Sequence, residues 1–169
     1  MKRIQKIWNH PLYQEQFVKL QQAESERIFC NHTLAHFLDV ARLAYIYSLE
    51  AKTGPDRELI YAAAFLHDIG RYQQLTDGIP HDQASAALAQ RILPDCGFTR
   101  EEINMIRYAI SHHRDCDNTQ SVSAAVSEEA RLLAAYLYRA DKQSRCCFSC
   151  AAESRCNWSN EKKNLQILL

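Results

Sequence analysis

Histidine and aspartate side chains recur at the ends of apolar stripes in this sequence, and both are typical metal ligands. Residues three, four and seven positions apart share one face of a helix, so a polar residue in line with such a stripe faces the core. A single inward histidine is usually a hydrogen-bonded core residue, whereas an inward aspartate needs a partner or a metal ion. Several stripes that end in the same ligand types favour one shared cavity. The residues in these positions are His36, His67, His81, His113 and Asp141.

Asp68 directly follows His67 at the expected end of its helix, where its side chain can turn toward the same cavity. Imidazole and carboxylate ligands together suit Mn, Fe, Co, Ni or Zn, and the more oxygen-rich positions also suit Mg. We therefore expect a centre that holds one or two divalent metals.

Three histidines are expected outside this centre. His112 falls on a different helix face from His113, and His10 is expected at the surface before a helix start. His32 could reach the cavity from its place four residues before His36, but it is not part of the predicted ligand set.

The elements that must carry these side chains are helices. The chain has only four glycines and four prolines, and apolar residues recur with helical spacing, so an all-α bundle of six or seven helices is predicted. Thr99 and Glu102 form a capping box at one helix start. Two polar stretches, 70–80 and 114–126, are predicted to be loops that border the site. The predicted helices cover residues 11–26, 33–52, 56–68, 81–94, 99–113 and 127–142.

The length of 169 residues predicts a single domain. Residues 1–145 should form its helical metal-binding part, and 146–169 a cysteine-containing appendage packed on the same domain. The 20 basic and 20 acidic side chains cancel, which disfavours a nucleic-acid polymer as partner. The sequence has neither an apolar signal region nor a run of about 18 apolar residues, so we expect a cytoplasmic protein without membrane contact.

Three segments form an ordered set of motifs: His36 with Val40 four residues later, Ala62-Ala-Ala-Phe-Leu-His67-Asp68-Ile-Gly-Arg71, and Arg139-Ala-Asp141-Lys142. The set resembles the HD-domain metal-dependent phosphohydrolase superfamily over residues 30–145. The resemblance implies an all-α bundle whose metal ligands are His36, His67, Asp68 and Asp141. In members that hold two metals, His81 and a histidine of the 112–113 pair match further ligands, and the stripe argument independently selects His113.

The resemblance also implies hydrolysis of a small phosphate ester or nucleotide by a metal-activated water. Asp68 would bridge two metals or orient the water. Arg71 and Lys142 would neutralise the phosphate, and further positive charge could come from Arg145 and Arg114. Arg71 stands where the family often has Lys, so the geometry of its grip on phosphate differs. The histidine pair is not followed by Gly-Tyr-Pro, which argues against hydrolysis of cyclic di-GMP.

Two other functions are compatible with the same ligands. Some relatives hold two irons and oxidise their substrates with O₂, and a di-iron HD-type oxygenase is therefore an alternative. A non-catalytic regulator that binds a metal or nucleotide is another. Iron together with O₂ consumption would indicate the oxygenase, whereas ligand-induced stabilisation without turnover would indicate the regulator.

Seven cysteines are unusual in a chain of this length, and four of them lie within residues 146–156. Thiols stay reduced in the cytoplasm, so ligands or packing residues are expected rather than disulfides. Cys147 and Cys150 have metal-ligand spacing, and Cys156 offers a third thiolate. Cys30 could complete the set, because it begins the helix that bears His36. The shared cavity requires this region to lie near Asp141, and the cysteine-rich segment follows the Asp141 helix directly.

We hypothesise a structural zinc or iron–sulfur site at Cys30, Cys147, Cys150 and Cys156. The alternative is that these are small reduced residues that pack a short tail. The cysteine-rich tail resembles that of a bacterial subgroup of HD proteins. Cys96 and Cys116 look incidental to either reading.

Overall fold

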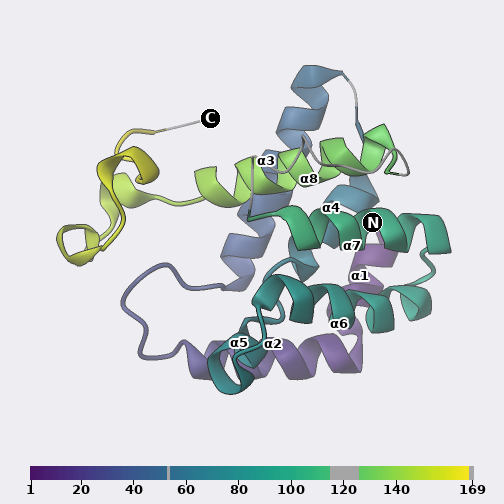
Figure 1. The fold of residues 1–169 in the computed structure, drawn as a ribbon, viewed down its shortest axis with the longest axis horizontal. Coiled ribbons are helices and arrows are strands. Elements are labelled where there is room, and N and C mark those ends of the chain that lie inside the picture. Colours follow the sequence, from purple (N-terminus) through teal and green to yellow (C-terminus); the bar gives the residue numbers. More distant parts are fainter. Residues whose placement is uncertain (53, 115–125, 168–169) are drawn as a thin grey trace.

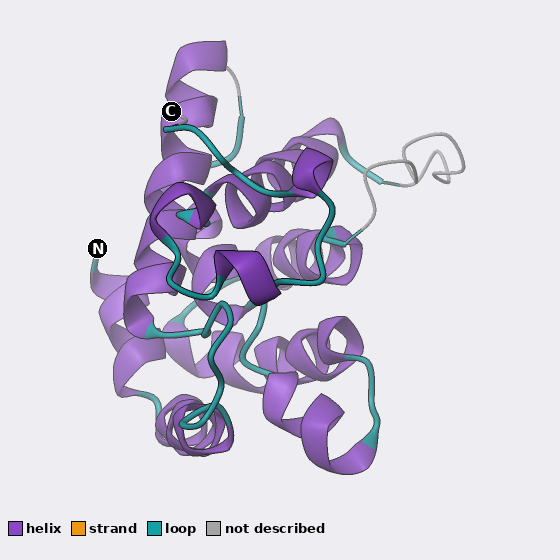
Figure 2. Ribbon diagram, turned by 90° about the vertical axis from the view of Figure 1, so that its left-hand side faces the viewer, coloured by secondary structure: helices purple, strands orange, loops and turns teal. Residues whose placement is uncertain are grey.

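A computed structural model describes residues 1–52, 54–114 and 126–167 of the chain. Over these residues the regular structure is entirely helical, which confirms the predicted all-α class (Figures 1 and 2). Short 3₁₀ turns follow the last α-helix. The α-helices are α1 Lys2–Asn9, α2 Pro11–Ala23, α3 Leu34–Ala51, α4 Arg57–Leu66, α5 Arg71–Asp77, α6 His81–Cys96, α7 Arg100–His112 and α8 Glu128–Gln143.

Side-chain caps begin five of the six predicted helices, and α6, which follows Pro80, has none. The Thr33 hydroxyl accepts a hydrogen bond from a backbone N–H in the first turn of α3, and Ser127 does the same for α8. Both bonds of the predicted capping box are present at the start of α7, between Thr99 and Glu102. Helix starts are therefore fixed by local hydrogen bonds that the sequence shows directly.

Two short helices, α1 and α5, are additional to the predicted elements. Helix α5 occupies much of the 70–80 stretch, which we expected to be a loop, and it buries none of its residues, so it has no apolar stripe. Helix α1 buries Ile4 and Ile7 but is only eight residues long. Helix α6 also continues past Pro94, where it was expected to end. The second predicted loop falls almost wholly on residues 115–125, which lie outside the described residues.

Helix α4 is the centre of the bundle. Seven of its ten residues are buried, and it packs against α1, α3, α6, α7 and α8. The His67–Asp68 pair directly follows its last turn. The polar pair therefore lies at the end of the most buried helix, where neighbouring helices can surround it.

Gly70 allows α6 to approach the end of α4 closely. A Cβ atom on Gly70 would lie 2.4 Å from the backbone nitrogen of Ser85 and 2.7 Å from the Cβ of Ala84. The Gly70 backbone nitrogen also donates to the Ser85 hydroxyl at 2.9 Å. This contact holds α6, and with it His81 in its first turn, beside Asp68.

The segment after α8 turns back against the end of that helix (Figure 1). The side-chain amide of Asn164 donates to the carbonyl oxygens of Lys142 and Arg145, both at 2.9 Å. The Phe148 backbone nitrogen donates to the Asn164 carbonyl.

None of the helices in the described residues has both the length and the apolar character needed to cross a bilayer.

Candidate metal centre

Six side chains from five helix ends meet at one buried place. His36 lies in the first turn of α3, His67 and Asp68 follow α4, and His81 begins α6. His113 follows α7, and Asp141 lies in the last turns of α8. Their ligand atoms form two groups, each with all atoms within 4.8 Å of one another. The first group is His36, His67, Asp68 and Asp141, and the second is Asp68, His81 and His113.

Asp68 belongs to both groups because its two oxygens face different histidines. Its Oδ2 lies 3.3 Å from His67 Nε2 and 4.0 Å from His36 Nε2. Its Oδ1 lies 3.1 Å from His81 Nε2 and 3.7 Å from His113 Nε2. The carboxylate is 3% exposed, so it bridges the two groups away from water.

Hydrogen bonds on the Nδ1 side leave the Nε2 atoms of these histidines free to bind a metal. His67 Nδ1 donates to the Ala64 carbonyl at 2.7 Å, and His113 Nδ1 donates to the Ile110 carbonyl at 2.6 Å. His81 Nδ1 donates to the side-chain oxygen of Gln74. A neutral imidazole that donates from Nδ1 carries its lone pair on Nε2 and points it in a fixed direction.

The centre places hydrogen-bond acceptors against acceptors. His81 Nε2 and His113 Nε2 are 3.3 Å apart beside the Asp68 carboxylate. In the part of the chain that the structure describes, His36 Nε2, His67 Nε2 and Asp68 Oδ1 are buried without a hydrogen-bond partner. Buried acceptors that face one another are unfavourable unless a cation lies between them. The residues therefore fit divalent metal ions, and the mixed nitrogen and oxygen donors suit first-row transition metals.

The ionisation of these groups agrees with this interpretation. Burial lowers the pKa of His36 to about 3 and that of His81 to about 4, so both are neutral at physiological pH. Burial alone would raise the pKa of Asp68 and Asp141, but the His67 charge holds both well below the usual range. Burial acts to lower the pKa of His67, yet the two aspartates raise it to about 10. In the absence of another cation, the carboxylates draw a proton onto His67.

Cationic side chains lie on two sides of the centre. Lys142 Nζ lies 2.5 Å from Asp141 Oδ2, and Arg145 lies 3.4 Å from the same oxygen. Arg71 lies on the other side, 3.9 Å from Asp68 Oδ1. Arg114 is exposed and pairs with Asp82, so it is set apart from these three.

His32 reaches the centre, although it was left outside the predicted ligand set. Its Nε2 lies 3.2 Å from Asp68 Oδ2, and its Nδ1 donates to the buried Glu24 carboxylate at 2.8 Å. Glu24 is 3% exposed and follows the inward line of Leu20 on α2. A carboxylate on an inward line needs a buried partner, and this signal could have pointed to His32.

The two other histidines lie apart from the ligand groups. His112 Nδ1 donates to the Tyr108 carbonyl, and the two rings stack at 4.0 Å. His10 pairs with Asp95 at 3.2 Å, and its Nδ1 accepts the Leu12 N–H at the start of α2.

The tail cysteines share a pocket with Cys30, and Cys96 lies elsewhere. Cys30, Cys147, Cys150 and Cys156 line one pocket together with Cys146. Cys96 is buried in α6, and Cys116 lies outside the described residues.

Comparison with known protein families identifies the family of this chain. The profile of the HD domain family matches residues 33–146, which is more than half of the chain and includes all six metal-centre residues. The chain belongs to the HD domain family. This agrees with the resemblance drawn from the His-Asp-Ile-Gly and Ala-Asp-Lys motifs.

Three relatives illustrate the range of similar proteins. An uncharacterized protein of Clostridium beijerinckii is 39% identical over 167 residues, covering 99% of both chains. Ribonuclease Y of Thermus thermophilus is 34% identical over 104 residues, but these are 62% of this chain and only 16% of that protein. The crystal structure of a predicted HD superfamily hydrolase from an uncultured Thermotogales bacterium aligns with a TM-score of 0.59 and 22% identity, covering 88% of this chain and 79% of that one. The last comparison supports the fold.

Proposed function

We propose that this protein is a metal-dependent phosphohydrolase that acts on a small phosphate ester or nucleotide. The observation that carries the proposal is the position of Asp68, whose two oxygens face two separate groups of histidines. This arrangement suits a pair of divalent metals that share one carboxylate. Membership in the HD domain family supports it further.

The six residues would hold the metals in two sets. His36, His67, Asp68 and Asp141 would bind one ion, and Asp68, His81 and His113 the other. Divalent metals in such a centre lower the pKa of bound water and screen the negative charge of a phosphate group.

The remaining polar side chains supply positive charge and orientation. The half-buried Lys142 and the more buried Arg145 offer N–H donors to a phosphate beside Asp141. Arg71 offers its guanidinium beside Asp68, and its Nε, which lies 3.7 Å from Glu24 Oε1, is a buried donor without a hydrogen-bond partner among the described residues. His32, held by Glu24, places its Nε2 3.2 Å from Asp68 Oδ2.

The size of the substrate is inferred from charge. The chain has no net charge, and binding of a long nucleic acid usually depends on a broad basic surface. Three cations beside a metal centre match one phosphate group rather than a polymer. The similarity to ribonuclease Y makes a short RNA a necessary comparison in the test.

The test is a panel of phosphate monoesters, nucleotides, dinucleotides and a short RNA, with added Mn²⁺ or Co²⁺ and without O₂. We expect phosphate or nucleotide release from a small ester, and loss of this release to background in Asp68→Asn. Elemental analysis of untreated protein should accompany the panel. Iron with O₂ consumption and no phosphate release would instead establish an oxygenase, and binding without turnover would establish a regulator. Cleavage of RNA alone would refute the small substrate.

A further inference from the structure

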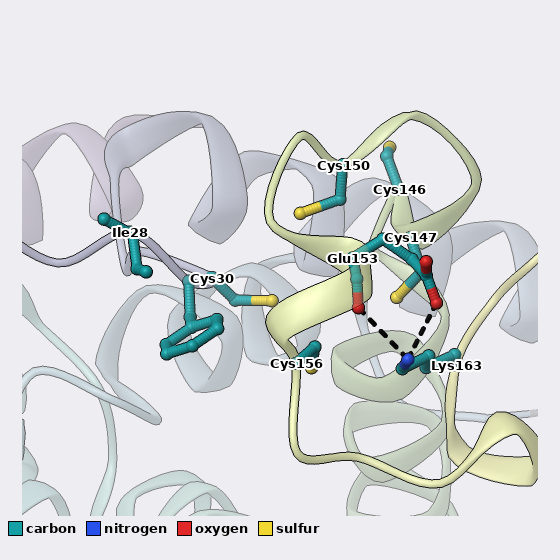
Figure 3. A pocket seen from close by; sticks show the side chains of 9 residues that line it. Ile28, Cys30, Cys146, Cys147, Cys150, Glu153, Cys156 and Lys163 are labelled. Carbon is teal, nitrogen blue, oxygen red and sulfur yellow. Dashed lines mark hydrogen bonds and ion pairs between the residues drawn. The ribbon is translucent and has the colours of Figure 1, made fainter.

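Five of the six cysteines in the described residues line a single pocket of about 150 Å³ (Figure 3). They come from two stretches that are more than a hundred positions apart in the sequence. One stretch precedes α3 and contributes Cys30. The other follows α8 and contributes Cys146, Cys147, Cys150 and Cys156. Convergence of thiols from distant segments is characteristic of a ligand site.

The tail places Cys147, Cys150, Glu153 and Cys156 at intervals of three residues. One 3₁₀ turn spans Cys147–Ser149, and the Cys150 N–H donates to the Cys147 carbonyl at 3.2 Å. A second turn ends with the Cys156 N–H, which donates to the Glu153 carbonyl at 3.1 Å. Residues i and i+3 of a 3₁₀ turn lie on the same side. Cys147 therefore lies on the same side of the first turn as Cys150, and Glu153 on the same side of the second turn as Cys156.

Four of the thiols line the pocket from the two stretches, namely those of Cys30, Cys147, Cys150 and Cys156. Figure 3 shows the sulfur atoms of Cys30 and Cys147 directed toward the middle of the pocket, whereas the sulfur of Cys146 is directed away from it. Four thiols are the number that a closed tetrahedral site requires.

The tail also lacks a hydrophobic core of its own. Between 146 and 167, Ala152 is the one buried residue, and the large apolar side chains Phe148, Trp158, Leu165 and Ile167 are exposed. Small segments that bury little apolar surface usually need a metal ion or disulfides to hold one structure. The cysteines in the described residues are free thiols, so they are available as metal ligands.

Positive charges lie next to the thiols. Lys163 Nζ is nearly buried and donates to the Glu153 side chain at 2.7 Å and to its carbonyl at 3.2 Å. It also interacts electrostatically with Cys147 and Cys156, and Arg145 interacts in the same way with Cys30. These cations would offset the negative charge of a metal bound by four thiolates.

We propose that Cys30, Cys147, Cys150 and Cys156 bind one structural Zn²⁺ ion, and that Cys146 is not a ligand. Zinc fits because its structural sites are tetrahedral, often Cys₄, and commonly contain a Cys-x₂-Cys pair such as the one at Cys147 and Cys150. The inference is independent of the proposed phosphohydrolase activity, because none of these residues belongs to the metal centre.

The zinc would connect two segments that border the metal centre. Cys30 lies two residues before His32, which contacts Asp68. On the tail side, the Arg145 guanidinium stacks 3.9 Å over Trp158 and also contacts Asp141. Zinc bound at the pocket would hold His32 and Arg145 in place from outside the centre.

Metal content of the full chain tests the proposal. The metal centre is first disabled by the double substitution His67→Ala and Asp68→Ala, after which we expect one zinc per chain to remain. Adding Cys150→Ser should remove that zinc, whereas adding Cys146→Ser should retain it as the matched control. Loss of zinc in both cysteine variants, or in neither, would overturn the assignment of ligands.

A measurement on the unmodified protein covers the case in which a cysteine variant fails to fold. Titration of the native protein with a mercurial should release one zinc as four thiols react, and Co²⁺ in its place should give the near-ultraviolet charge-transfer absorption of a thiolate complex. Four thiols that react freely without metal release would overturn the proposal, as would iron with inorganic sulfide or disulfide-bonded cysteines. Phosphohydrolase activity enters none of these readouts.

Discussion

Substitution of Gly70 by alanine is predicted to disturb the metal centre through packing alone. The new Cβ would lie 2.4 Å from the Ser85 backbone nitrogen, whereas ordinary contacts begin at 3.4 Å, so α6 must retreat by about 1 Å. Overpacking of this kind costs about 1–3 kcal/mol, and weakening the Gly70 hydrogen bond to Ser85 adds about 1 kcal/mol. We therefore expect the free energy of unfolding to fall by roughly 3 kcal/mol.

The same movement should reach the chemistry. His81 lies in the first turn of α6, and its Nε2 is now 3.1 Å from Asp68 Oδ1. A displacement of about 1 Å in a positioned group can cost on the order of 100-fold in rate. The assays are urea unfolding of the protein without added metal, metal content after loading with Mn²⁺, and turnover of whichever ester the panel identifies. We expect weaker binding of the metal held by Asp68, His81 and His113.

Gly78→Ala is the matched control for this prediction. Gly78 has a φ of +71°, so alanine there is strained by about 1–2 kcal/mol, but its Cβ would meet no atom of the described residues within 4 Å. It should destabilise the protein without changing metal content. If Gly70→Ala is no less stable than Gly78→Ala and keeps both metals, close approach of α6 is not what positions His81.

Three further predictions concern single side chains. His113→Ala should lower the metal content from two ions to one, whereas the adjacent His112→Ala should leave it unchanged, which elemental analysis can measure. His32→Ala removes the imidazole donor to the buried Glu24 carboxylate, which keeps only the backbone N–H of residue 32 as a hydrogen-bond donor, so stability to urea should fall by about 2 kcal/mol with both metals retained. Loss of a metal would show that His32 is a ligand. Arg3→Ala should cost about 2 kcal/mol at pH 7, because Arg3 joins α1 to carboxylates of α4 and α7. The hydrogen bond from Arg3 lowers the pKa of Glu58, so its contribution to the free energy of unfolding is present above the unfolded pKa of about 4.3. This contribution is lost as pH falls through the lower pKa of the folded state. A stability difference between Arg3→Ala and the unmodified protein that is unchanged at pH 2 would contradict this account.

Much of the metal centre could be predicted because its residues extend regular patterns. Five of the predicted ligands lie at one end of an apolar stripe, and the structure brings them together with Asp68. They are His36, His67, His81, His113 and Asp141. A helix face is a local property, so helical spacing suffices to identify it. The pairing of the two groups through opposite oxygens of Asp68 depends on how five helix ends meet, and spacing within one helix carries no such information.

The features that lie outside the predicted helices and ligand set lack periodicity or extend over few residues. His32 lies in the irregular segment between α2 and α3, where no stripe indicates which side faces inward. Helix α5 buries no residue, so its sequence looks like a polar loop. Helix α1 is short, and an eight-residue helix is marginal without tertiary contacts such as those of Arg3. For α1 the interactions of Arg3 with Glu58 and Glu102 join residues far apart in the chain.

The crowding of acceptor atoms around Asp68 makes bound metal a folding ligand as well as a cofactor. An ion that binds the folded chain at one hundred times its dissociation constant adds about 2.7 kcal/mol of stability, which corresponds to roughly 5–10 °C in melting temperature for a chain of this size. Thermal melts in the presence of different divalent ions would therefore rank those ions by affinity. Such a ranking needs no substrate, so the preferred metal can be identified first and the ester panel then run with that metal in place.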